Sequence, residues 1–219
     1  MALRRKEKRT ERSKLDATPP WDTSRHHDVP PTTGPFDHAD AGDAEQLQRL
    51  DLGALLIPAE TGLEIRVEVV EQGQVAGVTL VNEVGQMQLG VFAAPRKEGI
   101  WEDVRTEIKG AISKDGGTVN EQDGEFGPEL TGKLPGQGGV TPVRFIGVDG
   151  PRWFLRATLA GAPALDDAQA GPFLQALRQV IVVRGTEPLP VRDPVPLTLP
   201  KEAAEQVAAA AEQAQQQAE

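Results

Sequence analysis

The sequence predicts an α+β domain, with a mainly antiparallel sheet and two packed helices, flanked by polar tails. Short apolar runs with the two-residue alternation of strands recur along the middle of the chain, and Gly, Asn and Asp turns join them. Two other segments repeat apolar residues at three- and four-residue steps, as amphipathic helices do. The 219 residues include 18 Pro and 23 Gly, which favours one core with long polar ends over two cores.

The N-terminal tail, residues 1–42, mixes charge, proline and small polar residues without any period, and we predict that it is disordered. Residues 1–14 carry seven Lys/Arg and two Glu, about +5, in a chain whose net charge is −10. Such an arm predicts weak, non-specific contact with polyanions. The tail also holds His26, His27 and His38 beside acids. We predict no metal site there, because ordering a flexible tail around a metal opposes binding.

The predicted domain spans residues 43–185 and opens with a short helical turn over 44–50. A strand over 63–70 follows, in which apolar residues alternate with charged ones, as in a sheet with one solvated face. Strands at 75–81 and 86–93 come next after short turns, and the three strands together form an antiparallel meander.

A helix comes next, because Trp101, Val104, Ile108 and Ile112 line one stripe and Gly116-Gly117 stops it. Residues 118–134 then favour two weak strands around Asp123-Gly124.

Residues 142–161 predict the β-hairpin that anchors the core, since Trp and Phe gather here in a chain that is 4% aromatic. Asp149-Gly150-Pro151 has the chemistry of its turn. A second helix is predicted from Gly171-Pro172, where proline suits a first helical turn, and a buried strand end at 181–183. The predicted core residues are Trp101, Ile108, Phe145, Trp153, Leu155, Phe173 and Leu177.

The C-terminal part of the chain divides in two. Prolines recur every few residues between 186 and 200, which favours an extended strap packed on the domain. Residues 201–219 are almost entirely Ala, Gln and Glu, so helix propensity is high but no apolar stripe is available for packing. We predict a marginal, solvated helix there.

Six stretches carry a family resemblance: LDLGALLIP, GVFAAPRKEGIWEDVRTEI, FGPEL, VRFIGVDGPRWFLRATLAG, VIVVRG and PVRDPVPLTLP. As a set, over roughly residues 43–200, they resemble an uncharacterised family of actinobacterial proteins, a domain of unknown function. The resemblance implies no catalytic residues. Separately, the order of strands and helices is similar to the Mog1/PsbP-like α+β sandwich, a likeness of topology that does not fix function.

The amino-acid composition limits the kinds of catalytic and binding site that the chain can form. The chain has no Cys, which removes disulfides and thiolate sites. Residues 43–200 contain no His or Tyr and a single serine, Ser113, so a nucleophile triad lacks its base. The acid pairs Glu102-Asp103 and Asp166-Asp167 stand where helix starts favour acids. The glycine run at 136–139 lacks the strand–turn–helix frame of a phosphate loop. We predict no cofactor, and the balance is against an enzyme without excluding one.

Arginines near the hairpin and strap are the candidate binding residues: Arg144, Arg152, Arg156, Arg184 and Arg192. Residues 152 and 156 are four apart, so on one strand they would share a face, with Arg144 near them on the partner strand. Such a group can bind a carboxylate or a phosphate through bidentate hydrogen bonds. Alternatively, each arginine pairs with one of the abundant acids.

The function favoured by these observations is a cytoplasmic, non-enzymatic interaction or scaffold module with an unknown protein partner. No run of about 20 apolar residues is present to span a membrane, and the basic start lacks the apolar stretch of a signal peptide. The alternative is a small-anion-binding protein, or an enzyme, that uses an arginine face around Arg144, Arg152 and Arg156.

Overall fold

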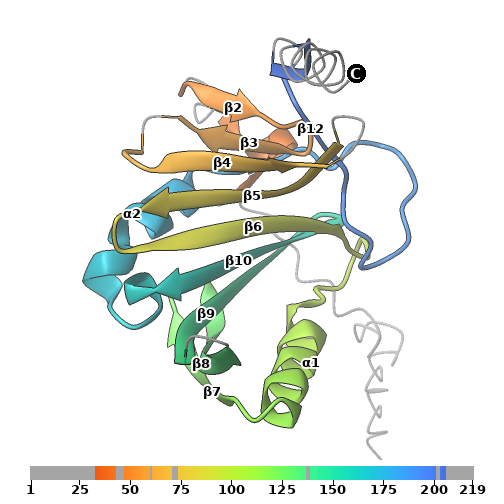
Figure 1. Cartoon of the computed structure of the whole chain (residues 1–219). Helices are drawn as coiled ribbons and strands as arrows, with labels where there is room; N and C mark the ends of the chain where they lie inside the picture. Colours follow the sequence, from red (N-terminus) through yellow and green to blue (C-terminus); the bar gives the residue numbers. More distant parts are fainter. Residues whose placement is uncertain are drawn as a thin grey trace, which may run out of the picture.

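The structure is a computed structural model that describes residues 33–42, 47–59, 61–70, 74–136, 139–200 and 203–205. Its main feature is a large antiparallel sheet packed with two helices, which confirms the predicted α+β class (Figure 1). Several predictions fall outside the described residues. They are the basic arm, His26 and His27, part of the helical turn at 44–50, the middle of the glycine run, and nearly all of the C-terminal helix.

The large sheet has the strand order β12-β5-β6-β10-β9-β8-β7, with β4 also paired to β5. All its ladders are antiparallel, as short turns between consecutive strands require. The meander predicted from alternation is β4-β5-β6. The strands are β4 (Glu64–Val69), β5 (Gln74–Asn82), β6 (Gly85–Ala93), β7 (Thr118–Gly124), β8 (Gly127–Gly136), β9 (Gly139–Gly150), β10 (Trp153–Gly161) and β12 (Leu197–Thr198).

A second, small sheet has the order β1-β11-β3-β2, and it differs from prediction in two places. Residues 33–42, predicted to be disordered, contain β1 and a short 3-10 turn, because β1 pairs with β11 and the Asp37 carboxylate accepts the Trp153 indole N–H. Where a helical turn was predicted up to Leu50, β2 pairs with β3. The elements are β1 (Phe36–Asp37), the 3-10 turn (His38–Asp40), β2 (Arg49–Asp51), β3 (Leu55–Pro58) and β11 (Ile181–Val182).

The first helix, α1 (Trp101–Lys114), begins where the sequence predicts. Its residue at the N-cap, Ile100, has no capping side chain of its own. Instead, Asp149 of β9 accepts hydrogen bonds from the backbone N–H groups of Ile100 and Trp101, at 2.8 and 3.3 Å. Asp149 is therefore a helix cap supplied by the neighbouring strand, in agreement with the preference of helix N-termini for acids.

The hairpin turn lies later than predicted. Gly150 pairs with Trp153 as the last pair of the β9–β10 ladder, which leaves Pro151 and Arg152 as the turn. Arg152 has a φ of 66°, and proline followed by a residue of positive φ is the pattern of a type II turn. Asp149 is bound to α1, so the turn uses Pro151 instead of the Asp-Gly pair.

The second helix, α2 (Asp167–Arg178), starts before the predicted Gly171-Pro172 and holds Pro172 inside it. The Asp166 side chain accepts a hydrogen bond from the Ala168 N–H at 2.9 Å. This N-cap fixes the start of the helix, and it outweighs the one helical hydrogen bond that Pro172 does not donate.

The core has two parts, one on each face of the large sheet. The larger part lies under α2 and includes Trp153, Leu155, Phe173 and Leu177, all buried. The smaller part lies under α1, where Trp101 is buried and stacks on Phe154 at 5.6 Å between ring centroids. The predicted core residues Ile108 and Phe145 are partly buried against this smaller cluster.

The strap is inserted between two strands of the large sheet. The β5–β6 ladder reaches Val78 and Leu89, and beyond it strap residues pair with both strands. The Val195 N–H donates to the Val91 carbonyl at 2.9 Å, and Leu197 pairs with Val75. The strap thus completes the sheet where β5 and β6 separate. Within the part of the chain that the structure describes, no helix is long and apolar enough to cross a membrane.

Candidate functional site

The candidate arginines do not form one common face. Arg156 lies opposite Gly90 and Gly147, on the α1 side of the sheet, whereas Arg144 lies opposite Leu159, on the α2 side. Arg152 is in the turn rather than in β10. Alternate residues of a strand point to opposite faces, so the pairing register separates Arg144 from Arg156. The predicted grouping of Arg144, Arg152 and Arg156 is therefore wrong in its geometry, and each arginine has its own surroundings.

Arg144 is a buried structural cation with 5% of its surface exposed. Its Nε donates to Glu129 Oε2 and its Nη1 to Asp167 Oδ1, both at 2.6 Å. Glu129 is fully buried, and its Oε1 has no hydrogen-bond partner among the described residues. Gly124 lies against this carboxylate so closely that a Cβ there would overlap it. Arg144 thus ties β8 to the start of α2 and is almost wholly enclosed by the fold.

The pKa of Glu129 is raised, first because burial disfavours its charged form. The hydrogen bond and charge of Arg144 lower this pKa, and the charges of Asp167 and Glu125 raise it. One guanidinium faces two carboxylates, so the cluster carries one uncompensated negative charge when Glu129 is ionised.

We expect Glu129 to make stability depend on pH. The pKa of Glu129 in the folded state lies above the value of about 4.3 in an unfolded chain, so the folded state binds the proton more tightly. The contribution is greatest below about pH 4.3 and is lost as the pH rises through the folded-state pKa. Urea unfolding from pH 8 to pH 4 should show wild type gaining stability relative to Glu129→Gln as the pH falls. A constant difference between the two proteins would contradict this expectation.

Arg192 is also paired, but at the surface. The strap residue donates to Glu107 at 2.5 Å and to Asp103 at 3.4 Å, both on α1. The bond with Glu107 raises the pKa of Arg192. Arg192 therefore joins the strap to α1. Of the predicted helix-start acids, Asp103 takes part in this contact, Asp166 caps α2, and Asp167 holds Arg144.

Arg156 has no acidic partner within the described residues. Its guanidinium lies over the ring of Phe92, 5.2 Å from the centroid. Burial lowers the pKa of Arg156, and no neighbouring carboxylate opposes this effect. The cross-strand neighbours of Arg156 are both glycines, so no side chain rises beside it from those positions. The ring of Phe92 lies near Gly90, and the ring of Trp101 lies against Gly147. Arg156 is thus a half-buried cation with an aromatic support and no counter-charge.

Arg152 and Arg184 form a second group without a paired acid in the described parts of the chain. Arg184 Nε donates to the Arg152 carbonyl at 3.0 Å, and its Nη1 donates to the Glu187 carbonyl at 3.2 Å. The pKa of Arg184 is lowered, by burial first and then by the positive charge of Arg152. Two like charges therefore stand close together, and the partners of Arg184 among the described residues are backbone carbonyls.

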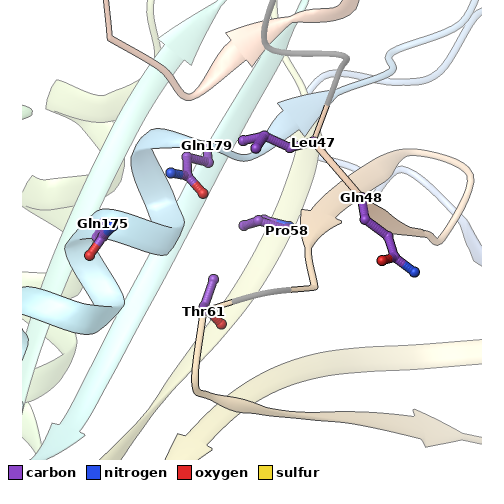
Figure 2. A pocket seen from close by; sticks show the side chains of 6 residues that line it. All are labelled: Leu47, Gln48, Pro58, Thr61, Gln175 and Gln179. Atoms are coloured by element: carbon purple, nitrogen blue, oxygen red, sulfur yellow. The ribbon is translucent and has the colours of Figure 1, made fainter.

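A cavity of about 150 Å³ lies away from all the arginines predicted to bind. Figure 2 shows Gln175 of α2 and Gln179, the residue after the helix, opposite Pro58 and Thr61. Sequence reasoning did not identify this cavity, because its residues come from distant segments and are common surface types. The described residues that line it have no ionisable side chain, so they offer hydrogen bonds and no acid–base chemistry. The lining residues are Leu47, Gln48, Pro58, Thr61, Gln175 and Gln179. Among the described residues, no cluster of His, Asp and Glu could hold a metal ion.

Comparison with known proteins places the chain in a family. Residues 34–206 match the family model described as "Protein of unknown function (DUF3710)", and the chain belongs to this family, which confirms the resemblance to a domain of unknown function. The match begins at residue 34, in agreement with the position of β1 at the edge of the small sheet.

No curated protein matches the chain. Among solved structures, the chain is similar to cyanobacterial PsbP (CyanoP) from Synechocystis sp. PCC 6803, with 12% identity and a TM-score of 0.39, over 62% of this chain and 91% of that one. This likeness is consistent with the Mog1/PsbP-like topology suggested by the order of elements. A likeness of this size carries no information on activity.

Proposed function

We propose that this protein is a cytoplasmic, non-enzymatic interaction module that binds an acidic group of a protein partner through Arg156. The observation that carries the proposal is a half-buried guanidinium, without an acidic partner among the described residues, on an open face of the sheet. The cytoplasmic location and the actinobacterial source remain predictions from the sequence.

The face around Arg156 is polar and open. On this side, β4 presents Arg66 between Glu64 and Glu68, and β6 presents Gln86 and Gln88, all exposed. The ladders place Thr79, Gln88 and Thr158 in one row across β5, β6 and β10, two residues along the strands from Gly90 and Arg156. Figure 1 shows these three strands side by side. An acidic side chain at Arg156 would therefore lie beside hydroxyl and amide groups able to bind the rest of a peptide.

A carboxylate fits Arg156 best. The planar guanidinium offers paired N–H donors that match the two oxygens of a carboxylate. Burial has already removed part of the hydration of Arg156, so binding a ligand removes less. The ring of Phe92 also restricts the side chain, which reduces the conformational entropy lost on binding.

We expect Arg156→Gln to abolish binding of an acidic peptide while the fold stays stable. Removing an unpaired, partly buried charge offsets the loss of the contact with Phe92, which is worth about 0.5–1 kcal/mol, so the free energy of unfolding should change by no more than about 1 kcal/mol. The measurement is an NMR titration with a hexaglutamate peptide that follows the Arg156 side chain and the amides of Gly90 and Gly147.

The matched control is Arg66→Gln, which removes the same charge from the same face. Arg66 is exposed and pairs with Glu64, so this variant should bind hexaglutamate as wild type does. Equal binding by wild type and Arg156→Gln, or equal loss in both variants, would overturn the proposal.

A further inference from the structure

A second group of cations lies at one end of the large sheet. Arg152 occupies the β9–β10 turn, and Arg184 follows β11 at the start of the segment that leads into the strap. Figure 1 shows this turn, the β6–α1 loop and the strap together at the same end of the molecule. The segments are also bonded to one another, since the Ala94 N–H donates to the Arg152 carbonyl at 3.0 Å.

Both arginines are held in place by the backbone. The Arg152 carbonyl accepts from Ala94 and from Arg184 Nε, which fixes the turn. Arg152 also has a φ of 66°, a left-handed conformation that non-glycine residues seldom adopt. The guanidinium of Arg184 uses Nε and Nη1 for carbonyl groups, which leaves Nη2 for a ligand. The guanidinium of Arg152 donates to no other described residue, so its donors can serve a ligand.

The charges of this pair are not balanced within the described chain. Neither arginine makes an ion pair there, and Arg152 and Arg184 repel each other. Yet the chain as a whole carries a net charge of −10, so acids are available in number elsewhere. Arg184 Nε is bonded to the backbone carbonyl of Arg152, and neither residue pairs with a carboxylate of the described chain. Two arginines placed together in this way can bind a multiply charged oxyanion.

We propose that Arg152 and Arg184 bind a phosphoryl group. A phosphate monoester carries a charge of about −1.5 to −2 at pH 7 and three acceptor oxygens. It can therefore balance both cations and accept from both guanidinium groups together. A carboxylate brings one charge and would leave one arginine uncompensated. This site uses other residues than the acidic-peptide face at Arg156, and the two proposals stand or fall separately.

The test is an NMR titration of the full chain with inorganic phosphate, phenyl phosphate and acetate at low ionic strength. Phosphate and phenyl phosphate should shift the side-chain signals of Arg152 and Arg184, and acetate should not. Tighter binding of phenyl phosphate identifies an esterified phosphoryl group as the ligand, whereas equal binding identifies the free anion. If neither phosphate shifts these signals at 10 mM, a concentration about tenfold above a Kd of 1 mM, the proposal is wrong.

Variants decide whether the two arginines carry the binding. Arg152→Gly removes one guanidinium and suits the left-handed backbone of the turn, and Arg184→Gln removes the other. Each should weaken phosphate binding about tenfold or more, the effect of one lost charge-assisted hydrogen bond.

The control is Arg192→Gly, because Arg192 also has a positive φ, of 75°, but is paired with acids of α1. It makes the same substitution with the same change in net charge, and phosphate binding should stay as in wild type. Equal weakening by Arg152→Gly and Arg192→Gly would show a response to net charge alone and overturn the proposal. Arg156→Gln should leave phosphate binding unchanged, which separates this result from the test of the acidic-peptide face.

Discussion

Replacing Arg144 by methionine should lower the free energy of unfolding by about 3–5 kcal/mol, the effect of leaving one member of a buried ion pair without its partner. Glu129 is fully buried, and Arg144 is its hydrogen-bond donor among the described residues. Without the guanidinium, the carboxylate must either keep an unpaired charge in the core or take up a proton. Urea unfolding at pH 7.5 measures the loss.

Two further measurements distinguish this cause from a general packing defect. The deficit of Arg144→Met should shrink at pH 5, because protonation of Glu129 removes the uncompensated charge. The double variant Arg144→Met/Glu129→Leu should recover most of the stability, since an apolar pair can replace a buried ion pair. Arg66→Met, at an exposed pair, is the surface control. A double variant no more stable than Arg144→Met would show that packing, and not charge, is responsible.

Trp153→Ala should also lower the free energy of unfolding by about 3–5 kcal/mol, as expected when a large aromatic side chain is removed from a core. Trp153 is 2% exposed and belongs to the larger core. Its ring also covers Gly150, where a Cβ would overlap it. Thermal unfolding measures the effect, and a melting temperature within about a degree of wild type would assign Trp153 to the binding of a partner instead.

The polar end of the same side chain can be tested separately. Trp153 Nε1 donates to Asp37 Oδ2 at 2.7 Å, across 116 residues of sequence. Trp153→Phe keeps most of the ring and loses this bond, so its effect should be much smaller than that of Trp153→Ala. Asp37→Ala should resemble Trp153→Phe, and the two changes together should be less than additive, because they remove the same interaction.

Local patterns were sufficient to predict the elements that pack by one face. Alternation over residues 63–70 predicts β4, and the stripe from Trp101 to Ile112 predicts α1. Elements held by distant partners were missed. Strand β1 has two residues, too few for a period, and pairing with β11 is what forms it. The start of α2 was placed too late because Pro172 was given more weight than the cap at Asp166.

The partners of the arginines also could not be predicted from local sequence. Sequence reasoning named these arginines as candidates but could not find their partners, since the acids that bind Arg144 and Arg192 lie between 15 and 89 residues away. The face of the sheet on which Arg144 and Arg156 each lie could have been predicted from the sequence. A two-residue hairpin turn pairs odd with even positions, so Arg144 faces Leu159 while Phe145 faces Thr158. The separation of Arg144 from Arg156 follows from this parity.

The segment Phe126–Leu130 lies at the turn between β7 and β8 and is anchored on both sides of the large sheet. Phe126 packs against the core under α2, and Glu129 holds Arg144 on that same side. The carbonyl of Pro128, between them, accepts the indole N–H of Trp101 from α1 at 2.7 Å. This segment of five consecutive residues thus makes contacts on both faces of the sheet. Loosening either helix would remove contacts from the segment that holds the other, so we expect the layers on the two faces of the sheet to unfold together.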